Sequence, residues 1–449
     1  MDLQQIAARA LEGMTAAGFD AAQVSVSVSE QDELNITHND PSLLRSTEDY
    51  SLSLMGVLDQ RKASITLTDL SPGVIDASID DLVERAKMAP QDEANAVAKD
   101  QRGRFEQGPV EGDLNLLAEK VQELLEFRAE KTPKMSIDEG AALHRVVREV
   151  LLTSEGTHLS SEIGSYSISV EGTASEGDKV SSYNYIGGVT NDLTQAHASE
   201  LFGIGNMLAE TERQIETRPT GGNFVGDVIL APTAIGDLIG WLLGQLGDYA
   251  LISDASLYKN SVGQQIASDK LTIRSRFDGP GHAAYTNDGY IAQPLTLIEK
   301  GELRHLLPGL YASRKTGIKH VPASSGWTID TGDTSKQDLI FGVKKGAMVT
   351  RLSMGSPGPN GDFSGVIKNS FIIENGEVGQ ALAEAMDAGV ARDRFFEVLE
   401  RDQVTQSDLG DLASFCPCRL PASSREHEML VELLFGDLGA DSEARVQRL

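Results

Sequence analysis

The chain has few cysteines, no dense basic segment and no long apolar run, and each shortage excludes a class of protein. Its 449 residues contain two cysteines, Cys416 and Cys418, which are too few for a disulfide framework. A bridge between them would span one proline and be strained, so both are expected to be thiols in a reducing compartment. No run approaches the roughly 18 apolar residues that cross a bilayer, and the N-terminus lacks a basic start followed by an apolar core. We therefore expect a cytoplasmic protein that does not enter membranes.

Basic residues are also scarce relative to acidic ones. Lys and Arg number 39 against 67 Asp and Glu, which gives a net charge of −28. This charge repels a phosphate backbone, and no cluster of Lys and Arg offsets it, so direct binding to nucleic acid is not expected. The acidity is interpreted as a solubilising surface, and the alternative is a groove that selects basic peptides.

Motifs for common catalytic mechanisms are missing as well. No two of the eight histidines lie within five residues of each other, so no helical histidine pair exists. The chain has no G-x-S-x-G or S-x-x-K motif, and the Gly-rich stretches lack the spacing of nucleotide-binding loops. Single histidines are interpreted as structural or surface residues. His282 is the first to test, because it ends the Gly-rich segment 277–282, where a tight structural loop is favoured over a binding loop.

The length and the apolar spacing predict two or three domains of the α+β class. Residues 1–90 alternate helical and strand-like spacing and form an N-terminal α+β module, with a hairpin at 59–62. Residues 91–112 lack periodicity and are predicted to be an exposed linker. Residues 113–222 form a central α+β module with helices at 114–130 and 191–216 and strands around 146–153 and 163–170. A Pro/Gly cluster at 218–222 ends it.

Residues 223–449 are predicted to form a largely antiparallel β-rich domain that carries one buried helix at 233–247. The apolar strand 228–230 and Pro232 precede this helix, and Thr233 is placed to cap its first N–H groups. Turn residues at 299–302 and the Asn375-Gly376 pair lie between strand-like arms, which predicts two hairpins.

Five segments resemble the TldD/PmbA family, the "modulator of DNA gyrase" proteins, and in particular its PmbA (TldE) branch. They are the strand, proline and helix of 225–246, the turn at 153–156, the stretch 310–317, the GDFS sequence of 361–364 and the hairpin of 371–377. The resemblance extends over nearly the whole chain. It implies the family's α+β fold and a relationship to metallopeptidases.

The resemblance also shows where the family's chemistry is lost. The helix of active TldD-type subunits carries an HExxxH motif that binds zinc, and this motif falls on 236–241. Gly236 and Trp241 replace the two histidines, and Asp237 replaces the glutamate. Glycine and indole offer no lone pair to a metal, so no metal ligand and no catalytic residue are predicted. Cys416 and Cys418 are interpreted as inert thiols, with a relic of the family's cysteine ligand or a redox switch as alternatives.

The resemblance therefore implies a subunit without its own cofactor that pairs with a zinc-containing TldD-type subunit. Such a pair would cleave unfolded peptides, including leader peptides, and this chain would bind extended peptide through strand pairing. His282, Asp362 and Ser364 are the candidate peptide contacts. One alternative is a self-sufficient metallopeptidase with ligands such as Cys416, His282 and Asp237. The other alternative is a homodimeric peptide-binding or scaffold protein.

Overall fold

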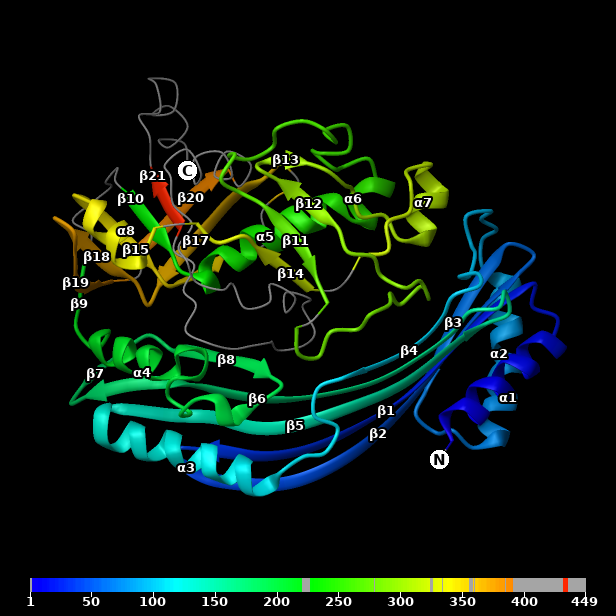
Figure 1. Ribbon diagram of the computed structural model, residues 1–449, viewed down its shortest axis with the longest axis horizontal. Coiled ribbons are helices and arrows are strands. Elements are labelled where there is room, and N and C mark those ends of the chain that lie inside the picture. Colours follow the sequence, from blue (N-terminus) through cyan, green and yellow to red (C-terminus); the bar gives the residue numbers. More distant parts are fainter. Residues whose placement is uncertain are drawn as a thin grey trace.

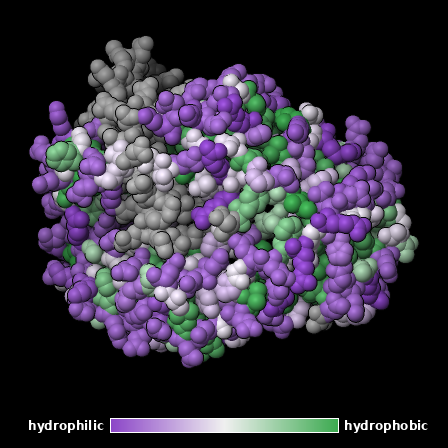
Figure 2. All heavy atoms as spheres, in the orientation of Figure 1, coloured by the Kyte–Doolittle hydropathy of each residue, from purple (hydrophilic) through white to green (hydrophobic). Residues whose placement is uncertain are grey.

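The long strands of the first half form a curved sheet, and the second half of the chain lies over it (Figure 1). The computed structural model describes residues 2–219, 227–277, 279–323, 326–332, 334–354, 358, 360–383, 385–390 and 431–434. Hydrophilic side chains predominate on the face shown in Figure 2, as the net charge of −28 implies. Within the described ranges, no helix is long and apolar enough to cross a membrane.

The first sheet contains eight strands in the order β3-β2-β1-β5-β6-β4, and β7 and β8 also pair with β6. All neighbours are antiparallel except β4, which runs parallel to β6. The strands are β1 (Ala21–Thr37), β2 (Asp40–Leu58), β3 (Arg61–Leu67), β4 (Arg102–Gln107), β5 (Met135–Thr153), β6 (His158–Glu176), β7 (Lys179–Val180) and β8 (Asn184–Thr190).

Alternation of side chains gives this sheet two different faces. Val24 and Val26 point to the face covered by α1 (Leu3–Ala16) and α2 (Pro72–Met88). The same face continues under α3 (Leu114–Lys131) and α4 (Ile204–Arg213). The residues between them in the strands point to the opposite face. The C-terminal half contacts this face where Tyr285 meets Glu149 of β5 and Ser161 of β6.

Three sheets and one buried helix make up the C-terminal half. A six-stranded sheet has the order β21-β10-β15-β18-β19-β9, a four-stranded sheet the order β13-β12-β11-β14, and a three-stranded sheet the order β16-β17-β20. Residues of the first two sheets pack around α5 in one apolar core. The elements are β9 (Thr217–Arg218), β10 (Asp227–Leu230), α5 (Pro232–Leu246), α6 (Asp248–Ile252), β11 (Ile273–Arg276), β12 (Thr296–Glu299), β13 (Glu302–Leu303), α7 (Leu310–Thr316), β14 (Gly326–Ile329), α8 (Lys336–Gly342), β15 (Lys345–Val349), β16 (Arg351–Met354), β17 (Asp362–Lys368), β18 (Phe371–Glu374), β19 (Glu377–Leu382), β20 (Ala385–Val390) and β21 (Val431–Leu434).

The predicted α+β class, the buried helix and the hairpins are confirmed, whereas the exposed linker at 91–112 is wrong. This segment contains β4, and Ala94, Val97 and Ala98 in it are almost completely buried. Pairing of β1 with β5 joins the predicted modules 1–90 and 113–222 in one sheet. The boundary at 222/223 stays a prediction, because 220–226 lie outside the described residues.

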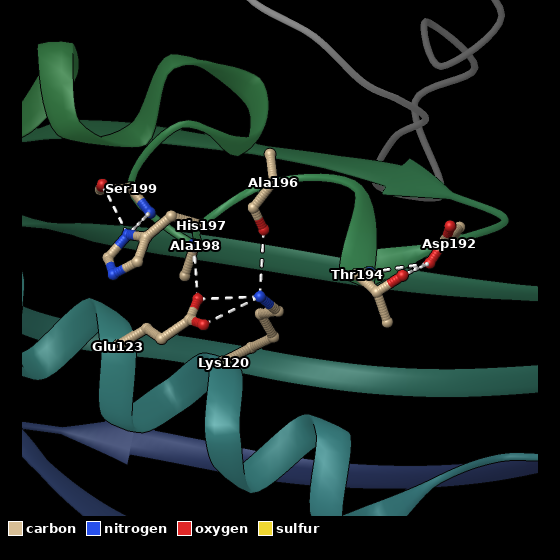
Figure 3. Close-up of polar contacts among 8 residues, drawn as sticks. All are labelled: Lys120, Glu123, Asp192, Thr194, Ala196, His197, Ala198 and Ser199. Atoms are coloured by element: carbon tan, nitrogen blue, oxygen red, sulfur yellow. Dashed lines mark hydrogen bonds and ion pairs between the residues drawn. The ribbon is translucent and has the colours of Figure 1, made fainter.

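The predicted helix 191–216 is also wrong in its first half. Only 204–213 is α-helical, and two 3-10 turns, η1 (Leu193–Gln195) and η2 (Leu201–Gly203), precede it. Phe202 and Gly203 have φ of 56° and 73°, which interrupts a right-handed helix. Polar contacts fix the turns (Figure 3), in which Asp192 caps Thr194 and Glu123 accepts the N–H of Ala198 at 2.8 Å.

Candidate functional site

Helix α5 is positioned by the strand before it. β10 pairs in parallel with β15, and Pro232 begins the helix directly after Ala231, whose N–H donates to Val349 O at 2.9 Å. Thr233 does not cap the helix as expected. Its hydroxyl donates to Thr350 O instead, and Ala231 occupies the N-cap position. This anchors the start of α5 to the end of β15.

Of the two positions that align with the family's histidines, Gly236 is buried and Trp241 is half-buried. Trp241 packs against the apolar core around α5. The indole N–H of Trp241 donates to Gly358 O at 3.2 Å, and its ring meets Tyr258 edge to face with centroids 6.2 Å apart. The described backbone places Asp237 within α5, next to Gly236.

These residues do not fit a zinc ion. Gly236 has no side chain, and the nitrogen of Trp241 donates a proton and has no lone pair for a metal. Across the part of the chain that the structure describes, no group of three His, Cys, Asp or Glu side chains is arranged to hold a metal. Cys416 and Cys418 lie outside the described residues.

The structure joins Trp241 to the turn that precedes β17, a contact that sequence reasoning missed. Gly358 accepts the indole N–H through its carbonyl and donates its own N–H to Asp362 O at 2.8 Å. The Asn360 side chain donates to the Asp362 carboxylate at 2.6 Å. The exposed Asp362 therefore lies at the end of a turn that packs on α5. Ser364 follows on the same strand, two residues along.

His282 lies in a packed loop rather than on an open surface. It is 6% exposed, and its backbone N–H donates to Gly279 O at 3.3 Å. Gln107 of β4 also donates to Gly279 O, at 2.6 Å, which ties the loop to the long sheet. A Cβ at Gly326 of β14 would approach His282 Nε2 to 2.9 Å. This packing favours the structural interpretation of His282.

A second feature missed from the sequence is a polar contact between the two halves of the chain. The Tyr285 hydroxyl donates to the Glu149 carboxylate at 3.1 Å and lies 3.0 Å from Ser161 Oγ. Burial and then the nearby charge of Glu149 raise the pKa of Tyr285. The phenol therefore stays protonated and holds the C-terminal half on the sheet. The sequence gives no sign of this contact beyond a single Tyr among loop residues.

A clasp at the end of the sheet joins α7 to the segment after α2. Asp92 accepts hydrogen bonds from Tyr311 at 2.8 Å and from Lys315 at 2.6 Å. Arg314 donates to the carbonyls of Glu93 and Ala94 at 2.7 and 3.1 Å. The Lys315 hydrogen bond is the largest cause that lowers the pKa of Asp92 to about 2.

Replacing Asp92 by Asn is expected to loosen this clasp at neutral pH and to matter less in acid. Because the folded protein lowers the pKa of Asp92 from 3.8 to about 2, its contribution is complete above pH 3.8 and is lost as the pH falls toward 2. Hydrogen exchange of the α7 amides in both proteins measures the difference. Glu93→Gln is the control, because Glu93 contributes its carbonyl to the clasp. A difference that stays constant down to about pH 2 would contradict this.

Trp241→Ala is expected to lower the free energy of unfolding by about 2–4 kcal/mol, because a large ring is lost from the core and Gly358 O loses its donor. Trp241→Phe keeps most of the packing and removes only the N–H, so it should cost about 1 kcal/mol. Urea denaturation followed by circular dichroism compares both variants with the wild type. Equal losses in the two variants would show that packing of the indole is unimportant.

The comparisons with known proteins agree with this fold. Residues 224–416 match the family model of the PmbA/TldA metallopeptidase C-terminal domain. The chain is 24% identical over 427 residues to "Metalloprotease PmbA" of Escherichia coli O157:H7, covering 88% of this chain and 90% of that protein. It is 23% identical over 286 residues to "Zinc metalloprotease TldD homolog" of Saccharolobus solfataricus, covering 59% and 62%.

The solved structure of TldE from Thermococcus kodakarensis has the same fold, with a TM-score of 0.77, 18% identity, and coverage of 96% of this chain and 99% of that one. A Bacteroides thetaiotaomicron protein, whose name refers to modulation of DNA gyrase, gives a TM-score of 0.82 at 20% identity, with coverage of 96% and 98%. These matches support a member of the PmbA/TldD family, whose curated relatives carry metalloprotease names. The same findings support the PmbA/TldE type, and the TldE structure itself shows the shared fold.

Proposed function

We propose that this chain is a non-catalytic subunit that works with a TldD-type partner, which supplies zinc and cleaves unfolded or leader peptides. The observation that carries the proposal is the pair Gly236 and Trp241 on α5. Neither residue can replace a histidine ligand, and Trp241 is already bound to Gly358 and packed on Tyr258. The proposal includes a cytoplasmic location, because a reducing compartment suits the closely spaced Cys416 and Cys418.

In this proposal the chain contributes binding of extended peptide. β16 pairs with β17 on one side, and the described residues place no strand along its other side. α5 packs close to β16, so a peptide that paired with β16 would run beside the helix. Such pairing reads the main chain and suits substrates of varied sequence. Asp362 and Ser364 are the proposed contacts for the part of the peptide that extends past Met354, because β17 continues beyond the end of β16 there, whereas burial removes His282 from them.

The test compares the chain alone with the chain mixed with a TldD-type subunit. Alone, we expect it to bind less than stoichiometric zinc and to leave an unfolded peptide intact. Together, we expect cleavage that a chelator stops. Asp362→Asn should raise the KM of the mixture for the peptide, whereas Asp254→Asn, an exposed carboxylate paired with Lys259, should not. Chelator-sensitive cleavage by the chain alone, with stoichiometric zinc, would instead support the self-sufficient metallopeptidase.

A further inference from the structure

Buried polar atoms without partners gather where two paired strands pass from the six-stranded sheet into the three-stranded sheet. β15 continues into β16 through Thr350, and β17 continues into β18 through Asn369 and Ser370. The pairing of β15 with β18 and of β16 with β17 places Thr350 opposite Asn369, and we call these two residues the sheet junction. Thr350 Oγ1, Arg351 Nε and both amide atoms of Asn369 are buried, and the described residues offer them no hydrogen-bond partner. Such atoms cost free energy, so a group of them indicates a place for a polar ligand.

Arg351 brings to the sheet junction a positive charge that no described carboxylate pairs with. Its Cζ lies 4.9 Å from the ring centroid of Tyr185, and one terminal nitrogen donates to Tyr183 O at 2.8 Å. Glu171, which pairs with Tyr185 in the long sheet, accepts a hydrogen bond from the Tyr183 hydroxyl instead. The guanidinium is thus held in place by neutral groups, and its charge is available to an anion.

The start of α5 adds to the positive character of this point. The Thr233 hydroxyl donates to Thr350 O, so the first turn of the helix lies against the sheet junction. Ala231, the N-cap residue, offers no side-chain oxygen to the first N–H groups of the helix. A helix N-terminus carries a partial positive charge that favours anions. Together with the Arg351 guanidinium and the buried amide of Asn369, which is 1% exposed, it makes a site for an anion with hydrogen-bond acceptors.

The same point closes one end of the edge to which a peptide would add. We call the side of 351–354 that faces away from β17 the β16 edge. β16 and β17 continue the pair β15 and β18, so the β16 edge continues the side of β15 along which β10 lies. β10 ends at Leu230, opposite Val349, and Pro232 then begins α5. A peptide on the β16 edge would therefore follow the line of β10 and stop against α5 at Arg351.

The charges at the two ends of the β16 edge determine which way such a peptide runs. A peptide antiparallel to β16 brings its C-terminal carboxylate to Arg351, whereas a parallel peptide brings its N-terminal ammonium there, which Arg351 repels. Past the other end lies the exposed Asp362 of β17, which attracts an ammonium and repels a carboxylate. β17 has seven residues from Asp362 to Lys368, the partner of Arg351, which is roughly 20 Å. A peptide of about seven residues reaches both ends.

We propose that Arg351, Asn369 and Thr350 bind the C-terminal carboxylate of an extended peptide that pairs antiparallel with β16. Arg351 supplies the charge, and the Asn369 amide and the Thr350 hydroxyl donate hydrogen bonds to the carboxylate oxygens. This inference rests on the proposed peptide-binding function. It adds the substrate class, which is unfolded peptides of about seven or more residues with a free C-terminus.

Peptides that differ only at the C-terminus test the site in the wild-type chain. A heptapeptide of alternating threonine and alanine with a free C-terminus should bind about tenfold more tightly than its C-terminal amide at about 0.1 M salt, because the amide lacks the charge. An amidated heptapeptide that ends in glutamate carries its carboxylate on a side chain and should bind as weakly as the other amide. Isothermal titration calorimetry with the purified chain gives the dissociation constants.

Variants test the residues. Arg351→Gln should bind the acid and the amide about equally, and Arg351→Lys should keep part of the preference for the acid, because it keeps the charge. Asn369→Gly accommodates the left-handed φ of 51° and removes the side-chain amide, so it should reduce the preference without changing the affinity for the amide peptide. Arg9→Gln, in an exposed pair with Asp76 on α1, is the control with the same charge change as Arg351→Gln.

The outcomes separate the carboxylate site from the peptide-binding function. Equal binding of acid and amide by the wild type would overturn the site and leave that function standing, whereas binding of neither would overturn both. Tight binding of the glutamate amide would show that any carboxylate is accepted, which contradicts recognition of the C-terminus. A preference that survives in Arg351→Gln would place the carboxylate elsewhere. The comparison in the wild type needs no variant, so it decides even if Arg351→Gln fails to fold.

Discussion

Gly164→Ala is expected to destabilise the protein by more than about 3 kcal/mol or to prevent its folding. Gly164 lies within β6, where the segment after β4 crosses the sheet. A Cβ at Gly164 would lie 1.7 Å from Pro109 O and 2.4 Å from Pro109 C. Both are backbone atoms, so no change of side-chain rotamer relieves the overlap. Gly108, with φ of 69°, makes the matching close approach from the other segment.

Gly244→Ala is the matched control. Gly244 lies in α5, and a Cβ there would meet nothing within 4 Å. Alanine should therefore stabilise the helix by about 0.5–1 kcal/mol. The urea midpoint of each variant, followed by circular dichroism, gives the comparison. A Gly164→Ala protein with the midpoint of the wild type would mean that the crossing at Pro109 is easily displaced.

The turns were predictable because their determinants are local. Asn375 and Gly376 have φ of 53° and 82°, which matches the hairpin turn that an Asn-Gly pair favours. Lys300 and Gly301 adopt similar angles between β12 and β13. Short apolar runs such as Phe371–Ile373 and Leu297–Ile298 lead into these turns, so a single window of sequence contains both an arm and the turn.

Elements that depend on distant partners were not predictable. Residues 40–51 of β2 are exposed on both faces, so they show no alternation, and only the pairing with β1 reveals the strand. β4 pairs with β6 across 56 residues of sequence, and its short polar sequence looks like a linker. The close approach of Gly164 to Pro109 also joins segments that are distant in sequence. Glycine spacing alone does not identify which backbone comes close.

In the candidate site, too, local features were predictable and contacts between distant residues were not. The resemblance located Gly236 and Trp241 on the helix, because strand, proline and helix are contiguous in sequence. The contact between Trp241 and Gly358 joins residues 117 positions apart, so no local pattern contains it. The packing of the His282 loop likewise involves distant partners, because β14 approaches His282 and Gln107 of β4 binds Gly279 O.

Lys120→Met is expected to cost about 2–3 kcal/mol of unfolding free energy, because it leaves a partly buried carboxylate without its cation. The Lys120 side chain is 5% exposed, and its Nζ donates to the Glu123 carboxylate at 2.9 and 3.0 Å and to Ala196 O at 3.0 Å (Figure 3). Glu123 keeps 21% of its side chain in water, which places the cost below that of a fully buried pair. Loss of this contact would also release the turns at 193–203 from α3.

The dependence on pH separates this ion pair from simple packing. Burial raises the pKa of Glu123, but hydrogen bonds from Lys120 and the Ala198 N–H outweigh it, so the pKa is lowered from its usual 4.5. The carboxylate therefore contributes stability that is complete above pH 4.5 and is lost as the pH falls through its lower folded value. The difference between Lys120→Met and the wild type should shrink over that interval, and Lys120→Met/Glu123→Gln should recover part of the loss at neutral pH. Lys87→Ala removes an exposed pair of the same i,i+3 spacing and should change little. A cost for Lys120→Met that does not vary with pH would assign the stabilisation to the aliphatic stem of Lys120.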